Sequence, residues 1–181
     1  MCSSDLRSAF PLPVNRPLQA VAPRDATSSY VSTRSGRATI WLSDETGRDA
    51  RELTPDHPGA IDLGWSPDGR TLFFSTQLSA NLDMFGLDEG RHGIYALDVE
   101  SGSLRQLTDH DALNRYPEMS PDGRTILYLT DVGTAHRQVW AMNPDGSGKR
   151  RITDIPGHKA RPTFSPDGSS VALQENDPTA Q

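Results

Sequence analysis

The chain has 181 residues, of which 34% are hydrophobic, 15 are glycine and 14 are proline, and its formal net charge at pH 7 is −6. This composition is typical of a turn-rich all-β protein rather than a helical or disordered one. No apolar run is long enough for direct insertion into a membrane, and the acidic balance argues against a nucleic-acid partner, because such binding depends on clustered Lys and Arg.

The first six residues, MCSSDL, look like the translation of a sequencing-adapter remnant. We therefore expect residues 1–6 to be foreign to the protein and residues 7–181 to form a single incomplete domain. The only cysteine, Cys2, lies in the foreign part. A native sequence without cysteine is compatible with an oxidising compartment and equally with the cytoplasm.

The tetrapeptide Ser-Pro-Asp-Gly occurs three times, in WSPDGRTLFF, MSPDGRTILY and FSPDGSSVAL. Its order matches a type I turn, because Ser accepts a local hydrogen bond, Pro fixes φ and Gly takes a positive φ. We predict that each copy is a hairpin corner. The serines are then turn caps rather than nucleophiles, since no base or strained elbow recurs beside them. The predicted turn residues are Ser66, Pro67, Asp68, Gly69, Ser120, Pro121, Asp122, Gly123, Ser165, Pro166, Asp167 and Gly168.

A longer unit repeats around these corners. The three serines are spaced 54 and then 45 residues apart, and RELT, RQLT and RRIT precede successive corners or their equivalents. Each interval holds an aromatic strand-like segment, TIWLSD, GIYALD or QVWAMN. Four short strands in a repeat of this length are typical of a β-propeller blade.

The predicted fold is therefore all-β, an incomplete propeller of four-stranded antiparallel blades. We place the blades at about residues 18–54, 55–108, 109–153 and 154–181, that is, three and a half blades of a propeller with six or more. The first blade is worn, because Ala-Pro-Arg-Asp replaces the tetrapeptide. The large residues expected to be buried between blades are Trp65, Phe73, Met119, Leu127, Trp140, Ile152 and Phe164.

The three tetrapeptides, the Leu-Thr or Ile-Thr endings and the aromatic third strands together resemble the repeats of the TolB β-propeller family. The resemblance implies a non-enzymatic bacterial module that binds a protein or peptide partner in the periplasm or another extracytoplasmic compartment. Similar repeats also form the N-terminal substrate-gating propeller of prolyl oligopeptidase-type serine peptidases, which is the alternative.

The sequence offers no enzyme signature of its own. It has no Gly-x-Ser-x-Gly elbow, and Asp-Gly-Ser-Gly-Lys-Arg from residue 145 lacks the upstream Gly and the following Ser or Thr of a phosphate-binding loop. We therefore predict no catalytic residue and no cofactor. The α/β domain that usually begins TolB itself is also missing from the sequence.

Candidate binding residues lie on the face that carries the connections between second and third strands. The extra nine residues of the longer repeat fall there, in an apolar and acidic loop. Exposed apolar residues on a loop indicate partner contact, although a lid folded over its own blade would have the same composition. The candidates are Asp83, Met84, Phe85, Asp88 and Glu89.

The same face is expected to carry His57, His110 and His158, each in a connection that leads into an inner strand. Three imidazoles near the mouth of a central channel could bind a metal, since histidine is the commonest metal ligand. The simpler interpretation is that they are polar loop residues, and no metal site is predicted.

Overall fold

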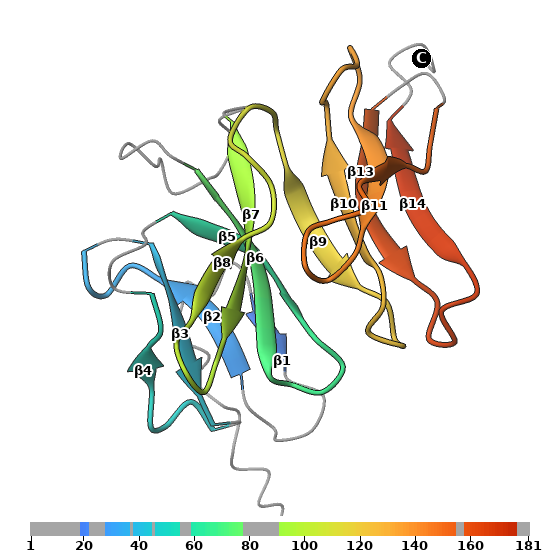
Figure 1. Ribbon diagram of the computed structural model, residues 1–181. Helices are drawn as coiled ribbons and strands as arrows, with labels where there is room; N and C mark the ends of the chain where they lie inside the picture. Colours follow the sequence, from blue (N-terminus) through green and yellow to red (C-terminus); the bar gives the residue numbers. More distant parts are fainter. Residues whose placement is uncertain are drawn as a thin grey trace, which may run out of the picture.

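The computed structural model describes residues 19–21, 28–36, 38–44, 46–54, 59–77, 91–154 and 158–176. These residues form fourteen strands and no helix (Figure 1). The strands make three four-stranded sheets and one two-stranded sheet, and every pairing is antiparallel. The prediction of an all-β propeller built from four-stranded blades is confirmed.

Each sheet is made of consecutive strands. The first sheet contains β1 (Gln19–Val21), β2 (Ser28–Ser32), β3 (Thr39–Ser43) and β4 (Arg51–Glu52). The second contains β5 (Ala60–Trp65), β6 (Thr71–Gln77), β7 (His92–Asp98) and β8 (Leu104–Gln106). The third contains β9 (Arg115–Met119), β10 (Ile126–Thr130), β11 (Gln138–Met142) and β12 (Arg150–Arg151), and the fourth contains β13 (His158–Phe164) and β14 (Val171–Asn176).

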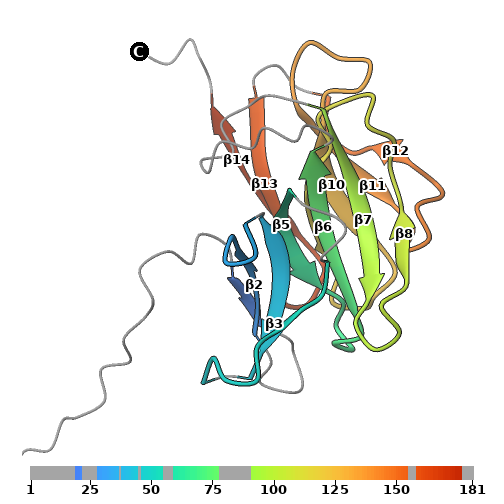
Figure 2. The ribbon, with the colours of Figure 1, turned by 90° about the vertical axis from the view of Figure 1, so that its left-hand side faces the viewer.

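The first strand of each sheet is the innermost one. Strand β1 contacts β5, β5 contacts β9, and β9 contacts β13, so these strands follow one another around the centre in chain order. In Figure 2, β6, β7 and β8 lie progressively farther from β5. In a propeller the innermost strands form the wall of the central channel.

The three tetrapeptides adopt the same hydrogen-bonded turn. In each, the Ser hydroxyl donates to the Asp Oδ1 at 2.6 Å and accepts from the backbone N–H five residues later, at 2.9 to 3.0 Å. The glycines have φ of 73°, 71° and 72°, a region that favours glycine because it has no Cβ. Both functions of the Ser hydroxyl are therefore used inside the turn.

The repeated Thr of the Leu-Thr and Ile-Thr endings closes each outer strand. The side-chain oxygens of Thr54, Thr108 and Thr153 each accept a hydrogen bond of 2.9 Å from a backbone N–H of the neighbouring third strand. The outer strands have only two or three residues, so these hydroxyls extend the pairing beyond the regular ladder.

The repeated Arg at the start of the same segments joins neighbouring sheets. Arg51 in β4 donates to the carbonyl of Val99 in the second sheet at 3.2 Å. Arg105 in β8 donates to the carbonyl of Pro144 in the third sheet at 3.1 Å. Each contact reaches the turn between the third and fourth strands of the next sheet, so the motif holds successive blades in register.

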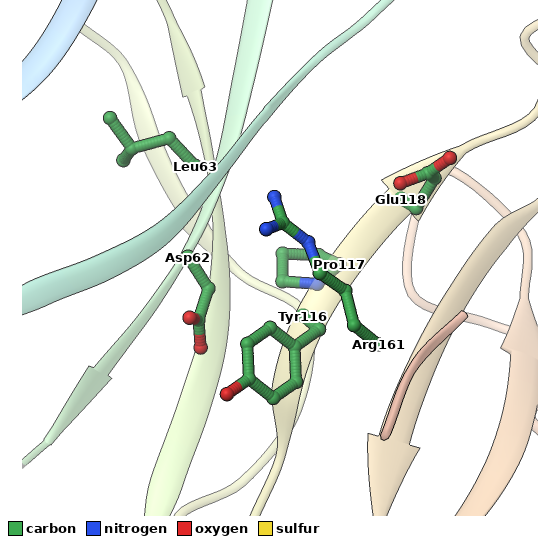
Figure 3. A pocket seen from close by; sticks show the side chains of 6 residues that line it. All are labelled: Asp62, Leu63, Tyr116, Pro117, Glu118 and Arg161. Carbon is green, nitrogen blue, oxygen red and sulfur yellow. The ribbon is translucent and has the colours of Figure 1, made fainter. Parts of the chain in front are cut away.

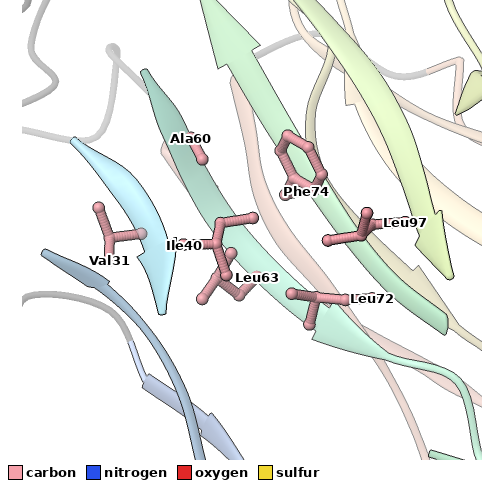
Figure 4. Packing of buried hydrophobic residues seen from close by; sticks show 7 residues of the cluster. All are labelled: Val31, Ile40, Ala60, Leu63, Leu72, Phe74 and Leu97. Atoms are coloured by element: carbon pink, nitrogen blue, oxygen red, sulfur yellow. The ribbon is translucent and has the colours of Figure 1, made fainter. Parts of the chain in front are cut away.

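The hydrophobic core lies between adjacent sheets. Between the first and second sheets, the buried residues are Val31, Ile40, Ala60, Leu63, Leu72, Phe74 and Leu97 (Figure 4). The residue that directly precedes each corner is partly buried and packs against the core between its own sheet and the preceding one. These residues are Trp65, Met119 and Phe164. Phe73 and Leu127 are buried as expected, each with 2% exposure.

The expectation for Ile152 was wrong, because this side chain is 47% exposed. At the equivalent position, Leu107 is only 4% exposed, since the backbone at Gly146 in the next sheet lies against it. The described part of the fourth sheet consists of β13 and β14 and provides no such turn over Ile152. Burial at this position is thus set by the neighbouring blade.

Candidate binding site on the innermost strands

Three innermost strands carry the same backbone irregularity. Asp62, Tyr116 and Arg161 each stand four residues before the Ser of a corner, and each has a positive φ, of 54°, 55° and 20°. The strand pairing shifts register at these three places, which is the mark of a β-bulge. A left-handed conformation of a non-glycine residue costs about 1–3 kcal/mol, and such residues cluster at functional sites. The recurrence indicates that the bulge is a regular feature of the second, third and fourth sheets.

The residues next to the bulge are compatible with an irregular strand. Pro117 and Pro162 follow the left-handed residue in two of the strands. Proline has no N–H to donate to the ladder, so it is found in a paired strand only at an edge or a bulge. In β5, Gly64 stands two residues after Asp62, and a Cβ there would lie 2.7 Å from the carbonyl oxygen of Pro117. Strands β5 and β9 therefore approach closely only because Gly64 has no side chain.

The bulges surround a hollow on the wall of the channel. Its lining residues come from β5, β9 and β13 and are Asp62, Leu63, Tyr116, Pro117, Glu118 and Arg161 (Figure 3). The hollow is a small depression that is partly open to solvent, well below the size of a small-molecule pocket. It could therefore contact only the end group of a larger ligand.

An ion pair joins two blades at this hollow. The Arg115 guanidinium donates from Nε to Oδ2 of Asp62 at 2.8 Å and from Nη2 to Oδ1 at 3.2 Å. The Asp62 side chain is 2% exposed and that of Arg115 is 15% exposed. The same guanidinium lies 4.7 Å from the centre of the Tyr116 ring, a cation–π contact. The pair fixes β5 against β9 and places Tyr116 beside it.

The other two charged residues of the hollow are differently placed. Glu118 is half-buried, and burial raises the pKa of its carboxyl, against the opposing effects of the Phe164 N–H and the Arg161 charge. Its Oε1 accepts a hydrogen bond of 3.1 Å from that N–H. Arg161 is exposed and makes no hydrogen bond or ion pair with the residues that the structure describes. The wall therefore presents one engaged carboxylate and one available guanidinium.

Residues 20–180 match the family model of the TolB beta propeller domain. The chain belongs to the TolB β-propeller domain family. It is 33% identical over 105 residues to Uncharacterized protein Atu1656 of Agrobacterium fabrum, an alignment that covers 58% of this chain and 32% of that protein. It is 29% identical over 134 residues to Uncharacterized peptidase YuxL of Bacillus subtilis, covering 59% of this chain and 20% of that protein. The chain thus matches no more than a third of the length of these two curated relatives.

Among solved structures, this TolB-family chain resembles a protein assigned as TolB from Agrobacterium tumefaciens. The TM-score is 0.77 and the sequence identity is 28%, over 90% of this chain and 55% of the other.

The residues that sequence analysis proposed for binding are only partly among the described residues. Residues 83–89 of the long loop and His57 fall outside the described residues. The backbone of His158 begins β13. His110 packs within the second blade, where its Nε2 lies 3.0 Å from the Tyr95 hydroxyl and a Cβ on Gly93 would meet its ring at 2.6 Å. The partner-binding loop and the three-histidine site stay predictions.

The pKa of His110 is set by its burial and by a neighbouring charge. Burial lowers its pKa, and the charge of Asp109 opposes this effect. The described residues hold no group of three His, Cys, Asp or Glu side chains that could bind a metal ion. Nor does any described segment form a helix with the length and apolar character to span a membrane.

The hollow of the TolB propeller was missed by the sequence analysis, although a signal was present. Pro117 and Pro162 stand three residues before the Ser of their corners, inside strands that must be paired on one side. A proline at that place indicates an edge strand or a bulge. The residue before it, four positions ahead of the Ser, is then the one whose backbone is re-aimed.

Proposed function

We propose that this chain is a non-catalytic binding module and that its partner is a protein or peptide which contacts the bulged innermost strands. One observation carries the proposal. Three successive strands hold a strained non-glycine residue at the same position, and the three side chains are an acid, a phenol and a base. A purely structural bulge would be more stable with glycine, so the varied side chains favour recognition.

The family supports a proposal for the compartment and for the kind of partner. TolB propellers bind protein partners in the periplasm, which supports an extracytoplasmic location for this protein. The net charge of −6 is consistent with a protein or peptide partner rather than a nucleic acid. The long loop is a second predicted contact, in which Met84 and Phe85 supply apolar area and Asp83, Asp88 and Glu89 supply charge at the rim.

Selection from a phage-displayed library of random twelve-residue peptides on the full-length gene product tests the proposal. We expect enriched peptides that bind the wild-type protein and lose at least ten-fold in affinity to Tyr116→Ala. Arg124→Gln, an exposed substitution at a corner, is the matched control and should bind as wild type does. Thermal melting of both variants checks that they are folded. Peptides that bind all three proteins equally would place recognition away from the innermost strands.

A second function is supported by the likeness to YuxL, which is described as a peptidase. In that case the propeller would gate access to a serine peptidase domain of the same gene product. A fluorophosphonate probe reacts with an activated serine and would label the native gene product in cell extracts. Labelling would favour the peptidase, and its absence alongside labelled control peptidases would favour the binding module.

A further inference from the structure

The three bulge residues differ in what they already bind. Asp62 is engaged on both oxygens by Arg115 and has a side chain that is only 2% exposed. Tyr116 has one ring face occupied by the same guanidinium. Arg161 is exposed and has no hydrogen bond or ion pair among the described residues. Of the three, Arg161 therefore has the most donor capacity left for a ligand.

Arg161 lies where its N–H donors can reach a ligand at the hollow. It belongs to the lining, together with Tyr116 and Glu118, and its bulge lies on β13, across the hollow from β5 (Figure 3). The positive φ of 20° fixes the direction in which its side chain leaves the strand. A guanidinium offers a planar fork of N–H donors that matches the two oxygens of a carboxylate.

Glu118 is the neighbouring group that limits what can bind. Its carboxylate influences Arg161 only through space, and its Oε1 is occupied by the Phe164 N–H. Glu118 would repel any carboxylate that a ligand brings to Arg161. A single ligand carboxylate would still gain the bidentate contact, whereas further negative charges on the ligand would only be repelled.

We propose that Arg161 anchors one acidic side chain of the peptide partner in this hollow. This inference rests on the proposed binding function and adds the chemical class of the group that is recognised. Tyr116 forms the aromatic part of the wall, and the Asp62–Arg115 pair positions it. Glu118 weakens the contact and keeps it reversible.

The test uses two fluorescent octapeptides made of glycine and serine, one with a single central glutamate and the other with a single central glutamine. Binding to the full-length gene product is measured by fluorescence anisotropy at low ionic strength, because salt screens such contacts. We expect the glutamate peptide to bind at least ten-fold more tightly. Arg161→Gln should remove this preference, Arg161→Lys should keep part of it, and Arg124→Gln should keep all of it. Glu118→Gln should strengthen binding of the glutamate peptide by a few-fold.

Several results would overturn the inference. These are equal binding of the two peptides by the wild-type protein, no binding of either up to millimolar concentration, or an unchanged preference in Arg161→Gln. Displacement of the glutamate peptide by millimolar phosphate but not by acetate would also overturn it, since the site would then be a phosphate site. If the phage selection yields peptides that depend on Tyr116 but carry no acidic residue, the binding function stands and only the anchoring role of Arg161 fails.

Discussion

Replacing Arg115 with methionine removes one partner of the ion pair between β5 and β9 and keeps most of the side-chain volume. Asp62 would then hold a charge in a place where its side chain is 2% exposed, without the two hydrogen bonds of 2.8 and 3.2 Å that it accepts from Arg115. Loss of one member of a buried pair costs about 3–5 kcal/mol, because the remaining charge is left uncompensated. We expect Arg115→Met to lower the free energy of unfolding by this amount.

The double variant Asp62→Asn with Arg115→Met separates the pair from the packing. It removes both charges, so it should be more stable than Arg115→Met alone. Urea unfolding followed by tryptophan fluorescence measures both, since Trp65 packs in the adjacent core and reports on β5. The reasoning is refuted if Arg115→Met costs less than about 1 kcal/mol, or if the double variant is the less stable of the two.

Three further outcomes are expected. Gly64→Ala should destabilise the fold by about 1–3 kcal/mol in the same urea assay, because its Cβ would lie 2.7 Å from the Pro117 carbonyl oxygen. The pKa of Asp167 is lowered to about 2, mainly by the Ser165 hydroxyl. The contribution of this carboxylate to the free energy of unfolding is therefore complete above about pH 4 and is lost as the pH falls toward 2. Carboxyl NMR titration should show a midpoint near the lowered pKa, and Ser165→Ala should return that midpoint toward 3.8. Phe85→Ala in the full-length protein should weaken partner binding by about 1–3 kcal/mol with an unchanged melting temperature, and a lower melting temperature with unchanged binding would make Phe85 a lid residue.

Some of the fold could be predicted from the sequence because local chemistry decides it. The corners depend on four adjacent residues whose hydrogen bonds are made within the turn, so Ser66 and Asp68 reveal the turn without knowledge of the rest. The length of the repeat then predicts four-stranded blades. The hollow could not be predicted in this way, because it depends on how β5, β9 and β13 approach one another and on the pairing of Asp62 with Arg115, 53 residues apart. Ile152 shows the same limit, since its exposure is set by the next blade.

The strain at the bulges allows stability and recognition to be separated at one residue. Arg161 has a φ of 20°, is exposed and makes no hydrogen bond or ion pair with described residues, so glycine in its place would relieve strain without loss of a contact. Relief of about 1–3 kcal/mol is opposed by the greater backbone entropy of glycine in the unfolded chain, about 0.5–1 kcal/mol. We expect Arg161→Gly to leave the free energy of unfolding unchanged or to raise it slightly, while binding of the glutamate peptide falls by at least ten-fold. Arg161→Val, a β-branched residue that tolerates positive φ poorly, should lose binding and stability together. If Arg161→Gly is clearly destabilising instead, the side chain supports the fold and the bulge at β13 is structural.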